Sequence, residues 1–169
     1  MLATELDQLR TEIKEIAKQY GGRREGLMPV LQHIQNKHRY VSPHAMQEVA
    51  AEFGIHPVEV HGVVSFYSFL STEKKGKFII RLCQTISCDM AGKVAVARQL
   101  ENELGIKFGQ TTKDGMFTLE YTNCLGMCDQ GPAMLVNTEV YTKVTPESVS
   151  EVIATYMKKF GAHVTQEVV

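Results

Sequence analysis

The four cysteines are the residues of this chain whose type and spacing most clearly suit chemistry. They form two pairs, Cys83-Gln-Thr-Ile-Ser-Cys88 and Cys124-Leu-Gly-Met-Cys128, and no cysteine lies elsewhere. A [2Fe–2S] cluster needs four thiolates, two for each iron. The chain can therefore supply the ligands of such a cluster as two short loops, one at each side.

Three other uses of four cysteines stay open at this point. A structural zinc site also takes four thiolates, but its ligand pairs usually form tight knuckles, which the C-x4-C and C-x3-C spacings suit less well. Two disulfides belong to oxidising compartments. A redox dithiol normally shows the spacing C-x-x-C, which the sequence lacks.

The composition is that of an ordinary globular protein. The 169 residues are 44% hydrophobic and 22% charged, and a formal net charge of −1 leaves no basic excess for nucleic acid. No apolar run reaches the ~18 residues of a membrane-spanning helix, and the first residues do not read as a signal peptide. We therefore expect a cytoplasmic protein without direct membrane insertion, in which paired cysteines favour a metal over disulfides.

Residues 1–72 predict a helical domain. Apolar residues spaced 4, 3, 4, 3 and 4 apart predict a helix over residues 3–20, with a double glycine at 21–22 as its end. This apolar seam suits packing either on the chain's own helices or on a partner subunit; its members are Leu2, Leu6, Leu9, Ile13, Ile16 and Tyr20. We expect the domain to dock a partner.

Three more helices complete this predicted domain. The first covers residues 25–38, and the second begins at Ser42-Pro43 and ends at Gly54. The third opens at His56-Pro57, and its inward face is predicted to be Val60, Val63, Val64 and Tyr67. The histidines of this region are spaced unlike metal-binding pairs on a helix, so we interpret them as surface or capping residues.

Residues 73–160 predict an α/β domain, and residues 161–169 a flexible tail. Strands are expected at 78–82, 116–122, 133–136 and 140–143, with one helix at 92–104 and another from Pro146 to about residue 160. The inward face of the first helix is predicted to be Val94, Ala97, Leu100 and Leu104. Because each cysteine pair follows a strand, both pairs are expected at the same edge of the sheet.

Two motifs, in this order, resemble those of the thioredoxin-like [2Fe–2S] ferredoxin family. The first runs from Gly54-Ile55 through Gly62-Val63 to Ser65-Phe66-Tyr67 and Phe69, and the second is C-x4-C followed by C-L-G-x-C-x-x-G-P. The resemblance covers residues 25–158. It implies an α+β chain, with an N-terminal helical bundle followed by a thioredoxin-like α/β domain.

The resemblance also implies a function. Members of this family are small redox subunits of complex I, of NAD-linked or electron-bifurcating hydrogenases and of NAD-dependent formate dehydrogenases. By this likeness Cys83, Cys88, Cys124 and Cys128 ligate one [2Fe–2S] cluster, which exchanges single electrons with a partner subunit that binds FMN and NADH. This chain has no G-x-G-x-x-G signature of its own.

Two alternatives are a zinc-stabilised interaction module and a thiol–disulfide oxidoreductase. Asp89, next to Cys88, departs from the family pattern. Its charge would lower the potential of the cluster if the side chain points inward.

Overall fold

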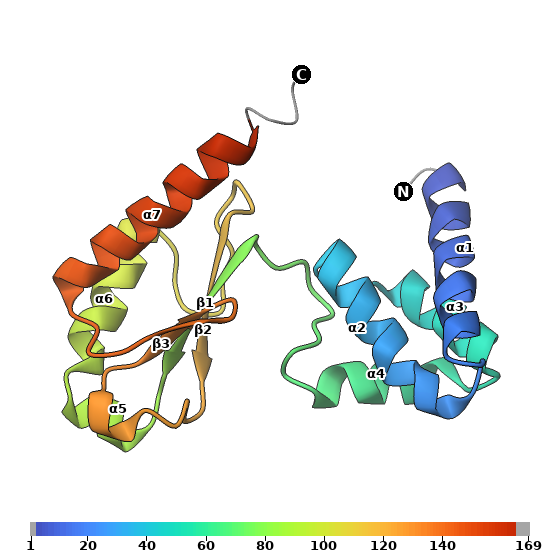
Figure 1. Cartoon of the computed structure of the whole chain (residues 1–169), viewed down its shortest axis with the longest axis horizontal. Coiled ribbons are helices and arrows are strands. Elements are labelled where there is room, and N and C mark those ends of the chain that lie inside the picture. The colour runs from blue at the N-terminus through green and yellow to red at the C-terminus, as the bar shows by residue number, and fades with distance from the viewer. Residues whose placement is uncertain (1–2, 165–169) are drawn as a thin grey trace. The chain divides into compact units, whose positions relative to one another are not determined.

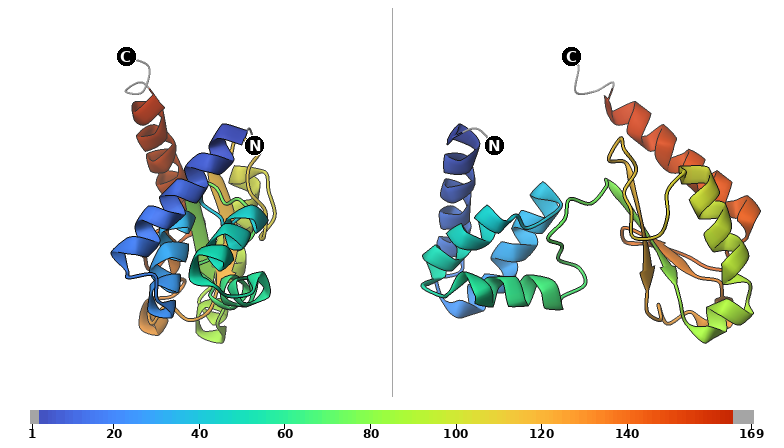
Figure 2. Two further views of the ribbon diagram at one scale, coloured as in Figure 1. Left: turned by 90° about the vertical axis from the view of Figure 1, so that its right-hand side faces the viewer. Right: turned by 180° about the vertical axis from the view of Figure 1, so that it is seen from behind.

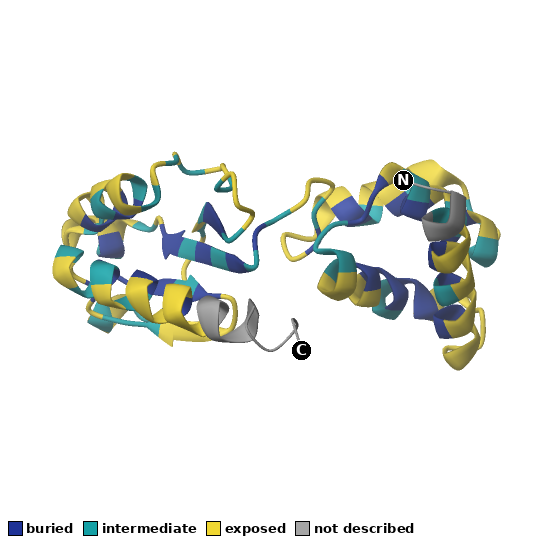
Figure 3. Cartoon of the chain, turned by 90° about the horizontal axis from the view of Figure 1, so that it is seen from above, coloured by how far each residue is buried: buried dark blue, intermediate teal, exposed yellow. Residues whose placement is uncertain are grey.

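The structure is a computed structural model that describes the backbone of residues 3–164 and the side chains of residues 6–159. The chain divides into two compact units, Met1–Lys75 and Gly76–Val169. Each unit has its own hydrophobic core, and buried residues line its inner faces (Figure 3). In the part of the chain that is described, no helix is both long and apolar enough to cross a bilayer.

The first unit is helical (Figure 1). Its elements are α1 (Ala3–Gln19), the 3-10 helix η1 (Arg24–Gly26), α2 (Leu27–His38), α3 (Pro43–Phe53) and α4 (Pro57–Phe66). The start of α3 is confirmed: Ser42 Oγ accepts a hydrogen bond from the Ala45 N–H at 3.1 Å, and Pro43 follows it. Its end at Gly54 is confirmed as well, because that residue adopts the left-handed conformation with φ 61°.

The seam of α1 packs inside the first unit. Leu9, Ile13 and Ile16 are buried in one core with α2, α3 and α4. Leu6 is half-buried, Tyr20 is 49% exposed beyond the end of α1, and Leu2 lies outside the described residues. The seam is therefore part of the core of this unit rather than a free surface.

One expectation for α4 is wrong. Val60 and Val64 are buried as predicted, and Val63 packs against the same core. Tyr67 is not part of the inward face, because the helix ends at Phe66 and Tyr67 is extended and 38% exposed. Its ring contacts the rings of Phe66 and Phe69 instead, with centroids 5.1 and 5.4 Å away.

The second unit is a four-stranded mixed sheet with two long helices on one side (Figures 1 and 2). In chain order it contains β1 (Phe78–Cys83), α5 (Ile86–Met90), α6 (Lys93–Leu104), β2 (Phe117–Thr122), the 3-10 helix η2 (Cys128–Gln130), β3 (Met134–Val136), β4 (Glu139–Tyr141) and α7 (Pro146–Val164). The strand order is β2-β1-β3-β4. β1 and β2 run parallel, whereas β3 is antiparallel to β1 and β4.

The helices α6 and α7 share one core with the strands. Leu100 from α6 and Ile153 and Tyr156 from α7 pack with the inward residues of β1 and β2, such as Ile80 and Leu119. This packing holds the strands in place. The ends of β1 and β2 then determine where the two cysteine loops begin.

Three sequence expectations for this unit need correction. Val94 is 48% exposed and Val96 is buried in its place, because the side of α6 that packs on the sheet carries Val96. Helix α5 lies in the first cysteine loop, where the sequence pattern indicates no helix. Helix α7 continues to Val164, past the predicted start of the tail at residue 161, and residues 165–169 lie outside the described residues.

Candidate metal centre

The two cysteine loops leave the sheet at the same edge. Cys83 is the last residue of β1 and is in register with Thr122, the last residue of the parallel strand β2. The Gln84 N–H donates to the Thr122 carbonyl at 2.9 Å and holds the two strand ends together. Cys124 follows two residues later, so the expected meeting of the pairs at one edge is present.

The first pair forms the buried side of this site. Cys83 and Cys88 are 1% and 2% exposed and pack in a small cluster with Ala133, against which Leu125 and Met127 also lie. Helix α5 carries Cys88 back toward the end of β1.

The second pair forms the exposed side. The Sγ atoms of Cys124 and Cys128 lie 3.3 Å apart, and both residues are exposed. The Gly126 N–H donates to Cys124 Sγ at 3.3 Å. Gly126 can turn its N–H toward the sulfur because it has a φ of 81°, which glycine adopts without steric cost.

Contacts between the loops bring the two pairs together. The backbone N–H of Leu125, from the second loop, acts to lower the pKa of Cys83, and the side chain of Ser87, from the first loop, acts to lower the pKa of Cys128, so each group lies near the sulfur of the other loop. Gly131 packs against the first loop so closely that a Cβ there would lie 3.4 Å from Cys88 Sγ and 3.3 Å from the Ala91 Cβ. The two cysteine pairs therefore lie beside each other at this edge of the sheet.

The surroundings shift the pKa of three thiols. Burial raises the pKa of Cys83, but hydrogen bonds from Thr85, Cys88 and the Leu125 N–H outweigh it, so the pKa is lowered. Burial and the neighbouring Cys83 raise the pKa of Cys88. The hydrogen bond and charge of Cys124 raise the pKa of Cys128. Two neighbouring thiolates repel each other, which disfavours ionisation of both thiols. A bound metal cation offsets this negative charge and allows both to ionise.

The donor set fits a [2Fe–2S] cluster. Four sulfurs in two pairs offer two thiolates to each of two irons. A single zinc ion instead takes four ligands around one point. Among the residues that the structure describes, no group of three or more His, Cys, Asp or Glu side chains is arranged to hold a metal ion, and this applies to the four cysteines as well. The preference for a cluster over zinc therefore rests on the pairing of the thiols.

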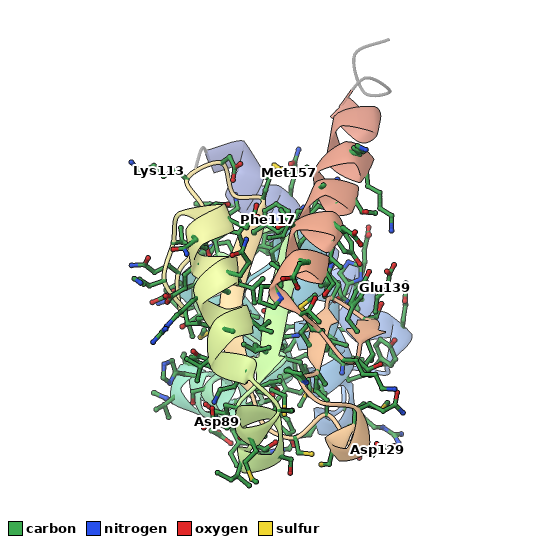
Figure 4. The ribbon with its side chains drawn as sticks, turned by 90° about the vertical axis from the view of Figure 1, so that its left-hand side faces the viewer. Asp89, Lys113, Phe117, Asp129, Glu139 and Met157 are labelled. Carbon is green, nitrogen blue, oxygen red and sulfur yellow. The ribbon has the colours of Figure 1, made fainter. Side chains whose placement is uncertain are left out.

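Asp89 does not point into the site. Its carboxylate is exposed, and Asp89 Oδ1 lies 3.1 Å from Lys93 Nζ, so the negative charge is paired. Figure 4 shows Asp89 and Asp129 at the same end of the second unit. The condition under which Asp89 would lower the potential of a cluster is therefore not met.

The histidines that the sequence places on helices are bonded within the first unit. His56 caps α4, because its Nδ1 accepts from the Val58 N–H at 3.2 Å. His33 Nε2 lies 2.9 Å from Glu12 Oε1. The predicted surface position of His33 and the capping role of His56 are confirmed, whereas His38 is half-buried.

The sequence indicates that hydroxyl and N–H groups of the small loop residues could hydrogen-bond the sulfurs, but it does not indicate which cysteine pair each residue lies against. Ser87 and Gly131 contact the opposite cysteine pair only because β1 and β2 are neighbours in the sheet. The contact of Thr85 is local in sequence: Thr85 lies two residues after Cys83, and its hydroxyl is 3.2 Å from that sulfur.

Known proteins resemble this chain over most of its length. It is 38% identical over 133 residues to a subunit of the NADH-quinone oxidoreductase of Rhizobium meliloti (strain 1021), a match that covers 79% of each chain. It is 38% identical over 144 residues to a subunit of the NADH-quinone oxidoreductase of Buchnera aphidicola subsp. Acyrthosiphon pisum (strain APS), covering 85% of this chain and 89% of that one.

A solved structure has the same fold. A chain of NAD+-reducing [NiFe]-hydrogenase in the air-oxidized state matches with a TM-score of 0.69 at 24% identity. The match covers 79% of this chain and 23% of the hydrogenase chain, so the common fold is one part of a longer chain there.

The family model described as thioredoxin-like [2Fe-2S] ferredoxin matches residues 13–157, which cover most of the helical unit, most of the sheet unit and all four cysteines. Together with the relatives above, this match confirms the resemblance drawn from the two sequence motifs. The chain belongs to the thioredoxin-like [2Fe–2S] ferredoxin family, and the cofactor of that family is one [2Fe–2S] cluster.

Proposed function

We propose that this chain is the [2Fe–2S] electron-transfer subunit of a multi-subunit NAD-linked oxidoreductase, with Cys83, Cys88, Cys124 and Cys128 as the cluster ligands. The observation that carries the proposal is the meeting of the two loops. The Gln84 N–H donates to the Thr122 carbonyl at 2.9 Å where both loops begin, and a Cβ at Gly131 would lie 3.4 Å from Cys88 Sγ. The Sγ atoms of Cys124 and Cys128 lie 3.3 Å apart.

The two cysteine pairs differ in exposure and therefore have different proposed roles. Cys83 and Cys88 are anchored to the end of β1 and to α5, where burial excludes water from their sulfurs. Cys124 and Cys128 are exposed and form the side that an electron-transfer partner can approach. When bound, the cluster accepts and releases one electron at a time.

The partner we propose is a subunit that binds FMN and NADH. The relatives are named as subunits of NADH-quinone oxidoreductases, which supports membership of an NADH-linked complex. The fold likeness to a chain of an NAD+-reducing hydrogenase is compatible with the same role. The absence of G-x-G-x-x-G from the sequence suits flavin and nicotinamide sites on another chain. Complex I, a bifurcating or NAD-linked hydrogenase and formate dehydrogenase are the candidate parents, in the cytoplasm.

Residues 1–72, which lie within the helical first unit, are the proposed partner-docking domain. Its core is complete, since the α1 seam is buried within it. The exposed rings of Phe66, Tyr67 and Phe69 at the end of α4 are then better suited to docking than the seam.

Metal analysis of anaerobically purified protein tests the ligand set. We expect about two irons and two acid-labile sulfides per chain, and an EPR signal of about one spin after dithionite reduction. One zinc per chain and no signal would instead establish the zinc-stabilised module. The subunit composition of the complex that co-purifies with a tagged chain identifies the parent complex. A complex without any flavin subunit would contradict the proposed partner.

A further inference from the structure

The hydroxyl of Thr85 is directed at a sulfur although a helix start lies beside it. Thr85 is the N-cap residue of α5, where threonine usually accepts a hydrogen bond from a backbone N–H of the first turn. Its side chain makes no such bond. The Asp89 N–H of the first turn donates to the Thr85 backbone carbonyl at 3.0 Å. The Thr85 hydroxyl lies 3.2 Å from Cys83 Sγ instead. Formation of the helix therefore does not explain where this hydroxyl points.

A second hydroxyl from the same loop reaches the other pair. Ser87 is half-buried within α5, and its side chain lies near Cys128, from the loop after β2, where it acts to lower the pKa of that thiol. Serine is a weaker helix former than alanine, so propensity does not favour serine at this position. Each cysteine pair thus has one hydroxyl neighbour, and both hydroxyls come from the short segment between Cys83 and Cys88.

The direction of these hydrogen bonds follows from the chemistry of the ligands. A cysteine sulfur that binds iron carries no proton, so it can only accept, and the hydroxyl must donate. A reduced cluster holds one more negative charge than an oxidised one, and part of that charge lies on the sulfurs. Hydrogen bonds donated to the sulfurs therefore stabilise the reduced form more than the oxidised form, which raises the reduction potential.

We propose that Thr85 and Ser87 are potential-setting residues, which donate O–H···S hydrogen bonds to Cys83 and Cys128 and make the cluster easier to reduce. This inference rests on the ligand assignment proposed above. It adds two residues of this chain that act on the electron transfer through the ligands and that are not ligands themselves.

The test is a potentiometric titration of the cluster, followed by EPR, in the full chain. Thr85→Val removes the hydroxyl at nearly constant shape, and Ser87→Ala removes the other hydroxyl at a helical position that alanine favours. We expect each variant to keep its cluster and to show a lower midpoint potential. For the double variant the ratio of reduced to oxidised cluster at a fixed potential should fall about tenfold, which for one electron is about 59 mV.

Two variants serve as matched controls. Thr155→Val removes a hydroxyl that bonds the Glu151 carbonyl in α7 at 2.8 Å, and Ser65→Ala removes one that bonds the Gly62 carbonyl in the first unit at 3.1 Å. Neither should change the potential. Thr85→Ser keeps the donor and should stay near the wild-type potential.

The outcomes separate this proposal from the one it rests on. Wild-type protein without iron and sulfide would overturn the ligand assignment and this inference with it. A full complement of cluster with unchanged potentials in Thr85→Val and Ser87→Ala would overturn the hydroxyl role alone. A shift in Thr85→Ser as large as in Thr85→Val would assign the effect of Thr85 to packing. If Thr85→Val assembles no cluster, Ser87→Ala decides: a lowered potential supports the role, and an unchanged one overturns it.

Discussion

The Sγ atoms of Cys124 and Cys128 lie 3.3 Å apart at an exposed position, while the other two cysteines of the site are buried. The proposed metal centre therefore has one side held in the protein interior and one side open to solvent. Buried ligands protect the centre, whereas exposed ligands shorten the path to an electron-transfer partner.

Serine substitution of any one cysteine should remove or strongly alter the cluster. Cys83→Ser, Cys88→Ser, Cys124→Ser and Cys128→Ser each take away one of four thiolates, so we expect all four visible spectra to differ from the wild type. Helical circular dichroism should persist, because the first unit has a core of its own. An unchanged spectrum would contradict the assignment of that residue. If the protein catalyses thiol–disulfide exchange and only one or two of the variants lose this activity, the result would point to a thiol–disulfide oxidoreductase.

Gly131→Ala should impair cluster assembly. The added Cβ would lie 3.4 Å from Cys88 Sγ and 3.3 Å from the Ala91 Cβ, so the first loop must shift by a few tenths of an ångström to admit it. Overpacking of this kind costs about 1–3 kcal/mol. The measurement is iron bound per chain, together with the free energy of unfolding.

The matched control for this change is Gly62→Ala. A Cβ at position 62 of α4 has open space around it, and alanine favours a helix over glycine by about 0.5–1 kcal/mol. This variant should be at least as stable as the wild type and should bind iron normally. Equal iron content in the two variants would show that the loops tolerate the extra atom.

Ile13→Asp should destabilise the first unit rather than only weaken partner binding. Ile13 is 1% exposed in the core that joins α1 to the other helices. Loss of its packing together with burial of a carboxylate should cost about 3–5 kcal/mol. Chemical denaturation of the isolated chain measures this loss. Gln8→Asp, at an exposed position of α1, is the control and should change stability by less than about 0.5 kcal/mol. Unaltered stability of Ile13→Asp with reduced assembly would place the seam at a partner interface.

Acidification should weaken the attachment of α1 to α2. Burial raises the pKa of Glu12, but hydrogen bonds from Lys37 at 2.7 Å and His33 at 2.9 Å outweigh it, so the pKa lies below its ordinary value of 4.5. A carboxyl with a lowered pKa stabilises the fold above the unfolded value, and this contribution is lost as pH falls through the folded value. Stability of the wild type should therefore fall below about pH 4.5, whereas Glu12→Gln should lack this part of the pH dependence. Parallel curves for the two proteins between pH 6 and 3 would exclude the role of Glu12.

The sequence predicted much of the fold from local signals. Helices such as α3 have a capping serine, a proline in the first turn and a glycine at the end, and these signals act within a few residues. In α6, Ala97, Leu100 and Leu104 pack inward as predicted, but Val94 is exposed and Val96 is buried instead, because the inward face depends on which side of the helix packs on the sheet. Helix α5 was missed because five residues are too few for a periodic pattern.

The sequence by itself determined the identity and pairing of the four candidate ligands, the order of the helical and sheet units and the resemblance to a family, because each depends on residue types at fixed spacings. The tertiary structure alone decided that the α1 seam is buried, that Lys93 pairs with Asp89, and that Ser87 and Gly131 contact the opposite cysteine pair. The α1 seam and the two contacts across the cysteine loops join segments far apart in the chain and exist only after packing places β1 beside β2 and the helices on a common core. The spacing of residues within one segment does not encode them.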